Sequence, residues 1–163
     1  MKEKKILITG ADGQLGKEFQ KVLSKKGIEC FSFSKEKMDI TDVVSVSGAI
    51  SEVNPDIIIN CAAYNFVDEA EENSDLAYEV NGKALENLSA VCKKNNIFLV
   101  HYSSDYVFDG TKEDFYNEDD IPNPLSVYGK SKLNGEKIIE ENLSDYLIFR
   151  VSWVFGEGKN NFL

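Results

Sequence analysis

The chain has 163 residues, 42% of them hydrophobic, which is enough for the core of one domain. Its 28 acidic and 18 basic residues give a net charge of −10, which argues against nucleic-acid and anionic-membrane partners. Three cysteines without Cys-x-x-Cys spacing and one histidine, His101, predict no metal site. With no apolar run near the roughly 18 residues of a membrane span and no signal peptide, a cytoplasmic protein is expected.

Short apolar runs alternate with segments of helical apolar spacing along the whole chain. In chain order the patterns predict a strand at 5–9, a helix at 14–26, a strand at 28–33, a helix from a Thr41 cap to about 53, a strand at 56–60, a helix at 74–95, a strand at 97–102, a loop at 109–124, a helix at 125–142 and a strand at 146–151. Alternation of this kind is typical of an α/β fold, a Rossmann-type doubly wound parallel sheet with helices on both faces.

A glycine-rich segment, Gly10-Ala-Asp-Gly-Gln-Leu-Gly16, joins the first predicted strand to the first helix. Glycines at this spacing let the backbone approach a ligand closely, and the free N–H groups at a helix start favour a pyrophosphate. The segment therefore predicts a dinucleotide site, with an ordinary strand-to-helix turn as the alternative.

The second predicted strand ends in Ser34 and Lys35 instead of the acidic residue that usually reads the ribose of NAD. A hydroxyl and a lysine tolerate a 2′-phosphate, so both NADPH and NADH are open, and Lys35 could also be simply solvated. Asp39 follows shortly afterwards, where its carboxylate could accept a hydrogen bond from an adenine amino group.

Tyr128 and Lys132 lie four residues apart in the predicted helix 125–142, so their side chains share one face. A fixed ammonium beside a phenol is expected to lower the tyrosine pKa from about 10 and to let it protonate a carbonyl oxygen. A surface helix with a solvated lysine is the alternative. Ser104 follows a strand end, where ligands bind in open parallel sheets, and could hydrogen-bond the same oxygen. His101 fits a core histidine better than a catalyst.

Longer segments carry a resemblance to a known family. The chain resembles the extended short-chain dehydrogenase/reductases and, within them, the dTDP-4-dehydrorhamnose reductase family. The resemblance covers the whole chain and rests on the segments 10–16, 55–64, 67–71, 101–110, 124–136 and 149–156. Asp-Tyr-Val-Phe-Asp-Gly at 105–110 and Arg-Val-Ser-Trp-Val-Phe-Gly at 150–156 are the most specific of these.

The resemblance implies that Tyr128 is the proton donor, that Lys132 tunes it and holds the nicotinamide ribose, and that Ser104 replaces a usual threonine. Together with the glycine segment and the strand ends, it gives a set of cofactor-binding positions: Gly10, Asp12, Gly13, Gln14, Leu15, Gly16, Ser34, Asp39, Ile40, Ala62, Ala63, Tyr64, Tyr102, Tyr128 and Lys132. The expected substrate-binding positions are Asn65, Val67, Ser104, Asp105, Tyr106, Tyr128 and Trp153.

The reaction that the resemblance implies is reduction of the C4 keto group of dTDP-4-dehydro-L-rhamnose to dTDP-L-rhamnose. Hydride would come from NADPH or NADH, and the product would serve nucleotide-sugar and surface-polysaccharide biosynthesis. Another nucleotide-sugar epimerase or dehydratase of the same fold, and a non-catalytic NAD(P)-binding regulatory subunit, remain open.

The extent of the chain carries a further expectation. Family members continue well past residue 163, so residues 1–163 are expected to be the NAD(P)-binding domain of a longer parent whose C-terminal substrate-binding region is absent here. The chain alone is then expected to turn over little substrate. Mg²⁺ is expected only through that absent region, and a homodimer only in the full-length parent.

Overall fold

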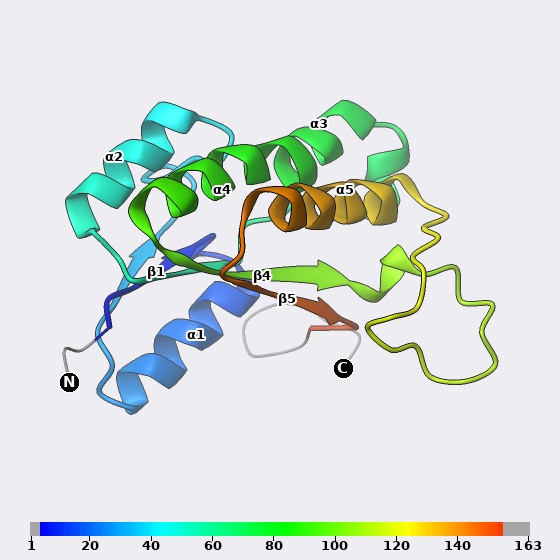
Figure 1. The fold of residues 1–163 in the computed structure, drawn as a ribbon, viewed down its shortest axis with the longest axis horizontal. Coiled ribbons are helices and arrows are strands. Elements are labelled where there is room, and N and C mark those ends of the chain that lie inside the picture. Colours follow the sequence, from blue (N-terminus) through cyan, green and yellow to red (C-terminus); the bar gives the residue numbers. More distant parts are fainter. Residues whose placement is uncertain (1–3, 155–163) are drawn as a thin grey trace.

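The computed structural model describes residues 4–154, which are built around a five-stranded parallel sheet (Figure 1). The strand order is β2-β1-β3-β4-β5, and all four pairings are parallel. The strands are β1 (Ile6–Thr9), β2 (Cys30–Phe33), β3 (Ile57–Asn60), β4 (Phe98–Ser104) and β5 (Tyr146–Val151). The predicted Rossmann-type sheet is confirmed, and its parallel register brings the carboxyl ends of the strands to one edge.

Helices cover both faces of the sheet (Figure 1). One face carries α1 (Gln14–Lys25), and the other carries α2 (Val43–Val53), α3 (Ser74–Tyr78), α4 (Ala84–Asn95) and α5 (Val127–Asn142). Successive strand residues point to opposite faces, so Leu7 joins the large core cluster under α2, α4 and α5, whereas Ile8 joins the smaller one under α1. Burial on both faces explains why the strands are almost continuously apolar.

The predicted helix at 74–95 is interrupted, which corrects the sequence analysis. A π-helical segment, η2 (Glu79–Lys83), separates α3 from α4. The wider π turn rotates the residues before it about the helix axis, relative to the residues after it. Leu76 is therefore 44% exposed, whereas Leu85 and Leu88 are buried. A local rearrangement of this kind is often found at functional sites.

Two helix starts also differ from the predictions. Helix α2 is capped by Asp42, whose carboxylate accepts a hydrogen bond from the Val44 N–H, whereas the Thr41 hydroxyl donates to Asp39. Helix α5 begins at Val127 because the Ser126 side chain accepts a hydrogen bond from the Gly129 N–H. Strand β4 continues to Ser104, two residues past its predicted end. The end of the 149–156 segment, at residues 155 and 156, lies outside the described residues.

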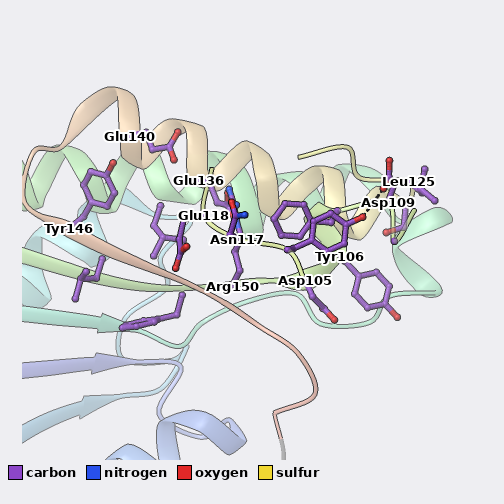
Figure 2. A pocket seen from close by; sticks show the side chains of 17 residues that line it. Asp105, Tyr106, Asp109, Asn117, Glu118, Leu125, Glu136, Glu140, Tyr146 and Arg150 are labelled. Atoms are coloured by element: carbon purple, nitrogen blue, oxygen red, sulfur yellow. Dashed lines mark hydrogen bonds and ion pairs between the residues drawn. The ribbon is translucent and has the colours of Figure 1, made fainter. Parts of the chain in front are cut away.

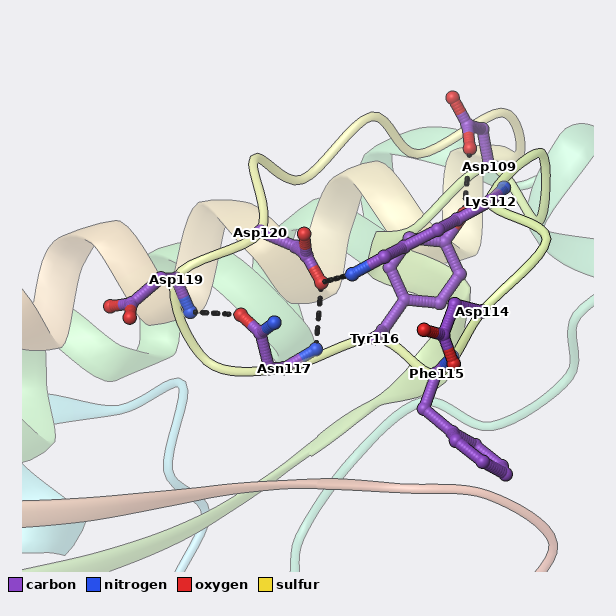
Figure 3. A network of polar contacts seen from close by, with 8 residues as sticks. All are labelled: Asp109, Lys112, Asp114, Phe115, Tyr116, Asn117, Asp119 and Asp120. Atoms are coloured by element: carbon purple, nitrogen blue, oxygen red, sulfur yellow. Dashed lines mark hydrogen bonds and ion pairs between the residues drawn. The ribbon is translucent and has the colours of Figure 1, made fainter.

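The predicted loop at 109–124 is held together by its own polar contacts (Figure 3). Asp109 accepts hydrogen bonds from the Thr111 hydroxyl, the Tyr116 hydroxyl and the Asn123 amide at 2.8, 2.9 and 2.9 Å. Lys112 Nζ lies 2.6 Å from the Asp120 carboxylate. The loop therefore has a defined shape beside the ends of β4 and β5.

None of the helices formed by residues 4–154 combines the length and apolar character that crossing a membrane requires.

Candidate active site

The glycine loop between β1 and α1 is packed against the end of β3. Gly10 has φ +59°, and a Cβ there would lie 2.7 Å from the Ala62 nitrogen. A Cβ at Gly16 would lie 2.5 Å from the Gly10 carbonyl oxygen. Both positions therefore require glycine, one for backbone conformation and close approach, the other for close approach alone.

The start of α1 fits the phosphates of a dinucleotide. Gly13 is the N-cap, so no side chain caps the first turn, and that turn has no acidic residue. Backbone N–H groups at an uncapped helix start attract an anion, and the helix dipole adds to the attraction. Asp12 is exposed beside the turn, whereas Gln14 and Leu15 are partly buried. The predicted dinucleotide loop thus has the donor set that a pyrophosphate needs.

Polar side chains gather at the end of β2, where the ribose of a dinucleotide would be read. The Ser34 hydroxyl donates to Glu36 at 2.6 Å, and Lys35 Nζ lies 3.8 Å from the Asp39 carboxylate. Asp39 already accepts hydrogen bonds from the backbone N–H and the hydroxyl of Thr41. The side chain of Ile40 is in the core with 3% exposed, which leaves little of it to line a cofactor.

The loop after β3 is fixed by a residue that the sequence analysis missed. Asn81, in the π-helical segment, is 1% exposed, accepts from the Tyr64 N–H at 2.8 Å and donates to the Tyr64 carbonyl at 2.9 Å. Its amide also donates to the Ser131 hydroxyl on α5 at 3.1 Å. Asn81 therefore ties the predicted cofactor loop, Ala62, Ala63 and Tyr64, to the helix that carries Tyr128. The sequence offered one signal for this role, namely a polar residue, Asn81, among the apolar positions of the predicted helix at 74–95.

Helix α5 brings the predicted catalytic pair to the sheet edge. Tyr128 is 8% and Lys132 2% exposed, so the surface-helix alternative is wrong. Lys132 Nζ donates to the Tyr102 carbonyl of β4 at 2.7 Å. Ser104 lies close enough to Tyr128 to affect its pKa, and its hydroxyl donates to the Asp105 carboxylate at 3.0 Å. Tyr128, Lys132 and Ser104 thus meet at the end of β4, as predicted.

The pKa of Tyr128 differs from the prediction. Burial raises the pKa of Tyr128 above its usual 10, against the lowering effect of the Ser104 hydrogen bond. Burial lowers the pKa of Lys132 to about 8, opposed by the negative charge of Glu136. The predicted lowering of the tyrosine pKa is wrong because burial of the phenol outweighs the lowering effects, and Lys132 is not among the groups that shift this pKa. Tyr128 accordingly keeps its proton at neutral pH, which is the state that a proton donor needs.

His101 is part of a buried polar chain. It is 1% exposed, and its Nδ1 accepts from the Asn60 amide at 3.0 Å, while the Thr9 hydroxyl donates to Asn60 Oδ1 at 2.6 Å. Burial lowers the His101 pKa well below its usual value, with a further contribution from the charge of Lys132. The prediction of a core histidine is confirmed. Burial likewise raises the pKa of the Cys61 thiol to about 12, so it is no nucleophile at neutral pH.

The predicted substrate positions lie around the mouth of this site. The Tyr106 ring meets the Tyr128 ring edge-on at 5.6 Å and is 43% exposed. Val67 packs in the same small cluster as Tyr128, and Asn65 is exposed in the loop after β3. Trp153, 68% exposed with φ +49°, follows β5, the neighbour of β4 in the sheet.

A cavity of about 910 Å³ adjoins the site and shares Asp105 and Tyr106 with it (Figure 2). It lies between β5 and the 109–124 loop and is also lined by Phe108, Glu136 and Arg150. Neither Glu136 nor Arg150 was singled out from the sequence. The cavity extends the open space at the sheet edge beyond Tyr128.

Comparison with known proteins identifies the family. Residues 4–163 match the family model described as the RmlD substrate binding domain. The chain belongs to this family. It is 42% identical over 160 residues to the dTDP-4-dehydrorhamnose reductase of Aggregatibacter actinomycetemcomitans, covering 98% of this chain and 54% of that protein. The predicted family resemblance is confirmed.

Solved structures of similar proteins agree with the RmlD-family fold. The crystal structure of dTDP-4-dehydrorhamnose reductase from Bacillus anthracis in complex with NADP is 40% identical, with a TM-score of 0.94, over 98% of this chain and 57% of that one. The Clostridium acetobutylicum reductase is 44% identical, with a TM-score of 0.92, over 97% and 56%. The chain therefore spans about half the length of the relatives that it matches.

Proposed function

We propose that this chain is the cofactor-binding and catalytic part of a reductase that converts dTDP-4-dehydro-L-rhamnose to dTDP-L-rhamnose. The observation that carries the proposal is the buried Tyr128 beside the end of β4, where Ser104 lies, one turn from the buried Lys132. Relatives named as dTDP-4-dehydrorhamnose reductases support the choice of sugar, and one of them was crystallised with NADP. These names and the site together support the proposed cofactor and substrate.

The glycine loop and the first turn of α1 would hold the pyrophosphate of NADPH or NADH, and the loop after β3 would line its path across the strand ends. When bound there, a nicotinamide cofactor supplies the hydride. Lys132, buried between α5 and β4, would hold the nicotinamide ribose. Ser34 and Lys35, at the end of β2, suit a 2′-phosphate.

The chain's own residues would carry the proton side of the reduction. As negative charge develops on the C4 oxygen, Tyr128 donates its proton and Ser104 holds the oxygen by a hydrogen bond. Tyr128 holds its proton at neutral pH, so the phenol is in the donor state before charge develops on the substrate oxygen. Positioned general acids of this kind contribute about 10²–10⁴-fold to rate.

Replacing Tyr128 tests the assignment in the protein at the full length of its relatives. Tyr128→Phe should lower kcat by at least about 10²-fold while the Kd for NADPH changes little, since the ring still packs against Tyr106. Turnover is followed by NADPH absorbance together with product analysis. Near-normal turnover in this variant would show that Tyr128 is not the proton donor. If the wild-type protein gave an epimerised product without consuming NADPH, it would be an epimerase and not a reductase.

We also infer a cytoplasmic protein, which the free thiols of Cys30, Cys61 and Cys92 support. That a C-terminal region supplies most of the substrate contacts, and that the full-length protein forms a homodimer or binds Mg²⁺ there, stays a prediction. A turnover comparison between the 163-residue chain and the full-length protein tests the first point.

A further inference from the structure

Helix α5 buries two opposite charges one turn apart. Lys132 is 2% and Glu136 1% exposed, and both side chains lie between α5 and the sheet. Residues four apart on a helix are neighbours, so the carboxylate lies next to the lysine on the same helical face. A buried carboxylate is costly to desolvate unless it is paired. A buried Glu136 therefore requires an oppositely charged partner, and its position next to Lys132 requires an explanation.

The partner of Glu136 is Arg150 of β5 (Figure 2). The arginine donates from Nε to both carboxylate oxygens, at 3.1 and 3.2 Å, and from Nη2 at 2.7 Å. The guanidinium also lies over the Phe108 ring, 5.1 Å from its centroid. This contact ties the helix that carries Tyr128 and Lys132 to the strand beside β4.

The charges around Lys132 give Glu136 a second role. The Lys132 ammonium donates to the Tyr102 carbonyl, and in residues 4–154 no carboxylate is hydrogen-bonded to it. From β4 it faces the neutral His101, and from its own helix it faces Tyr128 and Glu136. The more distant charges of Glu118 and Glu140 act on Arg150. Among these groups, Glu136 is the anion whose charge favours the protonated lysine.

We propose that Glu136 is a positioning residue for the Tyr128–Lys132 pair, since it keeps the buried Lys132 charged and, through Arg150, fixes α5 to β5. The catalytic meaning of this inference rests on the proposed reductase function, but the charge on Lys132 is a property of the chain itself. An apolar pair would join helix and strand at least as firmly. Packing alone therefore does not explain a carboxylate one turn after Lys132.

The test removes both charges of the ion pair together. In the double variant Glu136→Gln/Arg150→Met, neither member of the ion pair is left without the other, so folding is retained. Titration of the Lys132 side chain by NMR, in protein with ¹³C,¹⁵N-labelled lysine, should show its midpoint lowered, by less than the full effect of one carboxylate because the more distant positive charge of Arg150 is removed as well. In the full-length enzyme the high-pH limb of kcat/KM should move down by the same amount.

Glu140→Gln is the matched control, because it removes the same charge one turn further along α5 at an exposed position. Its Lys132 midpoint should move by less than about 0.3 units. Glu136→Asp, which keeps the charge, should restore most of the wild-type midpoint. An unchanged Lys132 midpoint in the folded double variant would overturn the proposal, whatever the effect on turnover.

A measurement on the wild type covers the case in which the double variant fails to fold. The ¹³C carboxylate signal of Glu136 should shift as Lys132 loses its proton near pH 8, and that of Glu140 should not. A Glu136 signal that is flat through this range would also overturn the proposal. Failure of the reductase function itself would instead show as normal turnover by Tyr128→Phe, which leaves the lysine titration unaffected.

Discussion

Lys132 stabilises the fold less at neutral pH than at alkaline pH. Its pKa is lowered by burial from 10.5 to about 8, so between these values the unfolded chain binds a proton that the folded chain lacks. The contribution of Lys132 to folding free energy therefore rises as pH increases through this window. In the catalytic role proposed for Lys132, its charge would be held at the expense of stability, as is common at active sites.

Replacing this lysine should reveal the cost. The variant Lys132→Met lacks the titrating group. Its free energy of unfolding minus that of the wild type should therefore be about 2–3 kcal/mol larger at pH 7 than at pH 10. Urea denaturation at the two pH values measures the difference, and Lys130→Met, at an exposed position on the same helix, is the control. A difference that does not change with pH would show that Lys132 is not strained by burial.

Gly10 combines a left-handed backbone with close packing, and Gly27 separates the two effects. Gly27 has φ +67°, and a Cβ added there would meet nothing within 4 Å, so Gly27→Ala should cost about 1–2 kcal/mol from backbone strain alone. Gly10→Ala should cost about 2–4 kcal/mol, because its Cβ also meets the Ala62 backbone. Thermal unfolding and NADPH titration measure both variants. Cofactor affinity should fall in Gly10→Ala alone, and equal losses of affinity would place the glycine loop outside the cofactor site.

At the scale of elements, the π-helical segment η2 determines where the loop after β3 lies. It directs Asn81 so that one side chain pairs both backbone groups of Tyr64 and reaches Ser131 on α5. Gly135 of α5 packs against the Asn81 carbonyl, where a Cβ would not fit. Helix α5, the loop after β3 and the π turn are therefore tied together beside Tyr128.

Two asparagines allow this element-scale role to be tested. Asn81→Leu should destabilise the chain by about 2–4 kcal/mol, since it leaves buried Tyr64 backbone groups unpaired, and should lower kcat at least about 10-fold. Asn87→Leu removes a comparable amide that binds the Ile40 and Thr41 carbonyls away from the catalytic pair. Its stability loss should be of similar size without the fall in kcat. If both variants lose turnover equally, Asn81 contributes stability and nothing more.

At the scale of the whole molecule, local patterns were sufficient to predict the fold class and most of the candidate site. The glycine spacing, the buried strand runs and the Tyr128–Lys132 interval are all contained in short segments, and the parallel sheet then brings their ends together. Cofactor and substrate assignments for individual positions stay predictions.

Features that depend on contacts between distant segments escaped the sequence analysis. The Tyr128 pKa is set by burial and by Ser104, 24 residues away, and not by the lysine one turn along. Asn81 acts on Tyr64 through a π turn that helical periodicity does not reveal. In the sequence, Glu136 does not differ from the other acidic residues of a charged helix. Its role becomes visible only in the fold, where β5 places Arg150 against it.

The Glu136–Arg150 pair also bears on the order in which a newly made chain folds. A ribosome releases α5 before β5, so a nascent chain that has extruded Glu136 has no Arg150 to neutralise it. Docking α5 at that stage would bury a lone carboxylate, which disfavours premature closure of this side of the sheet. Helix α5, which carries Tyr128, is thus expected to take its final position only after β5 has emerged.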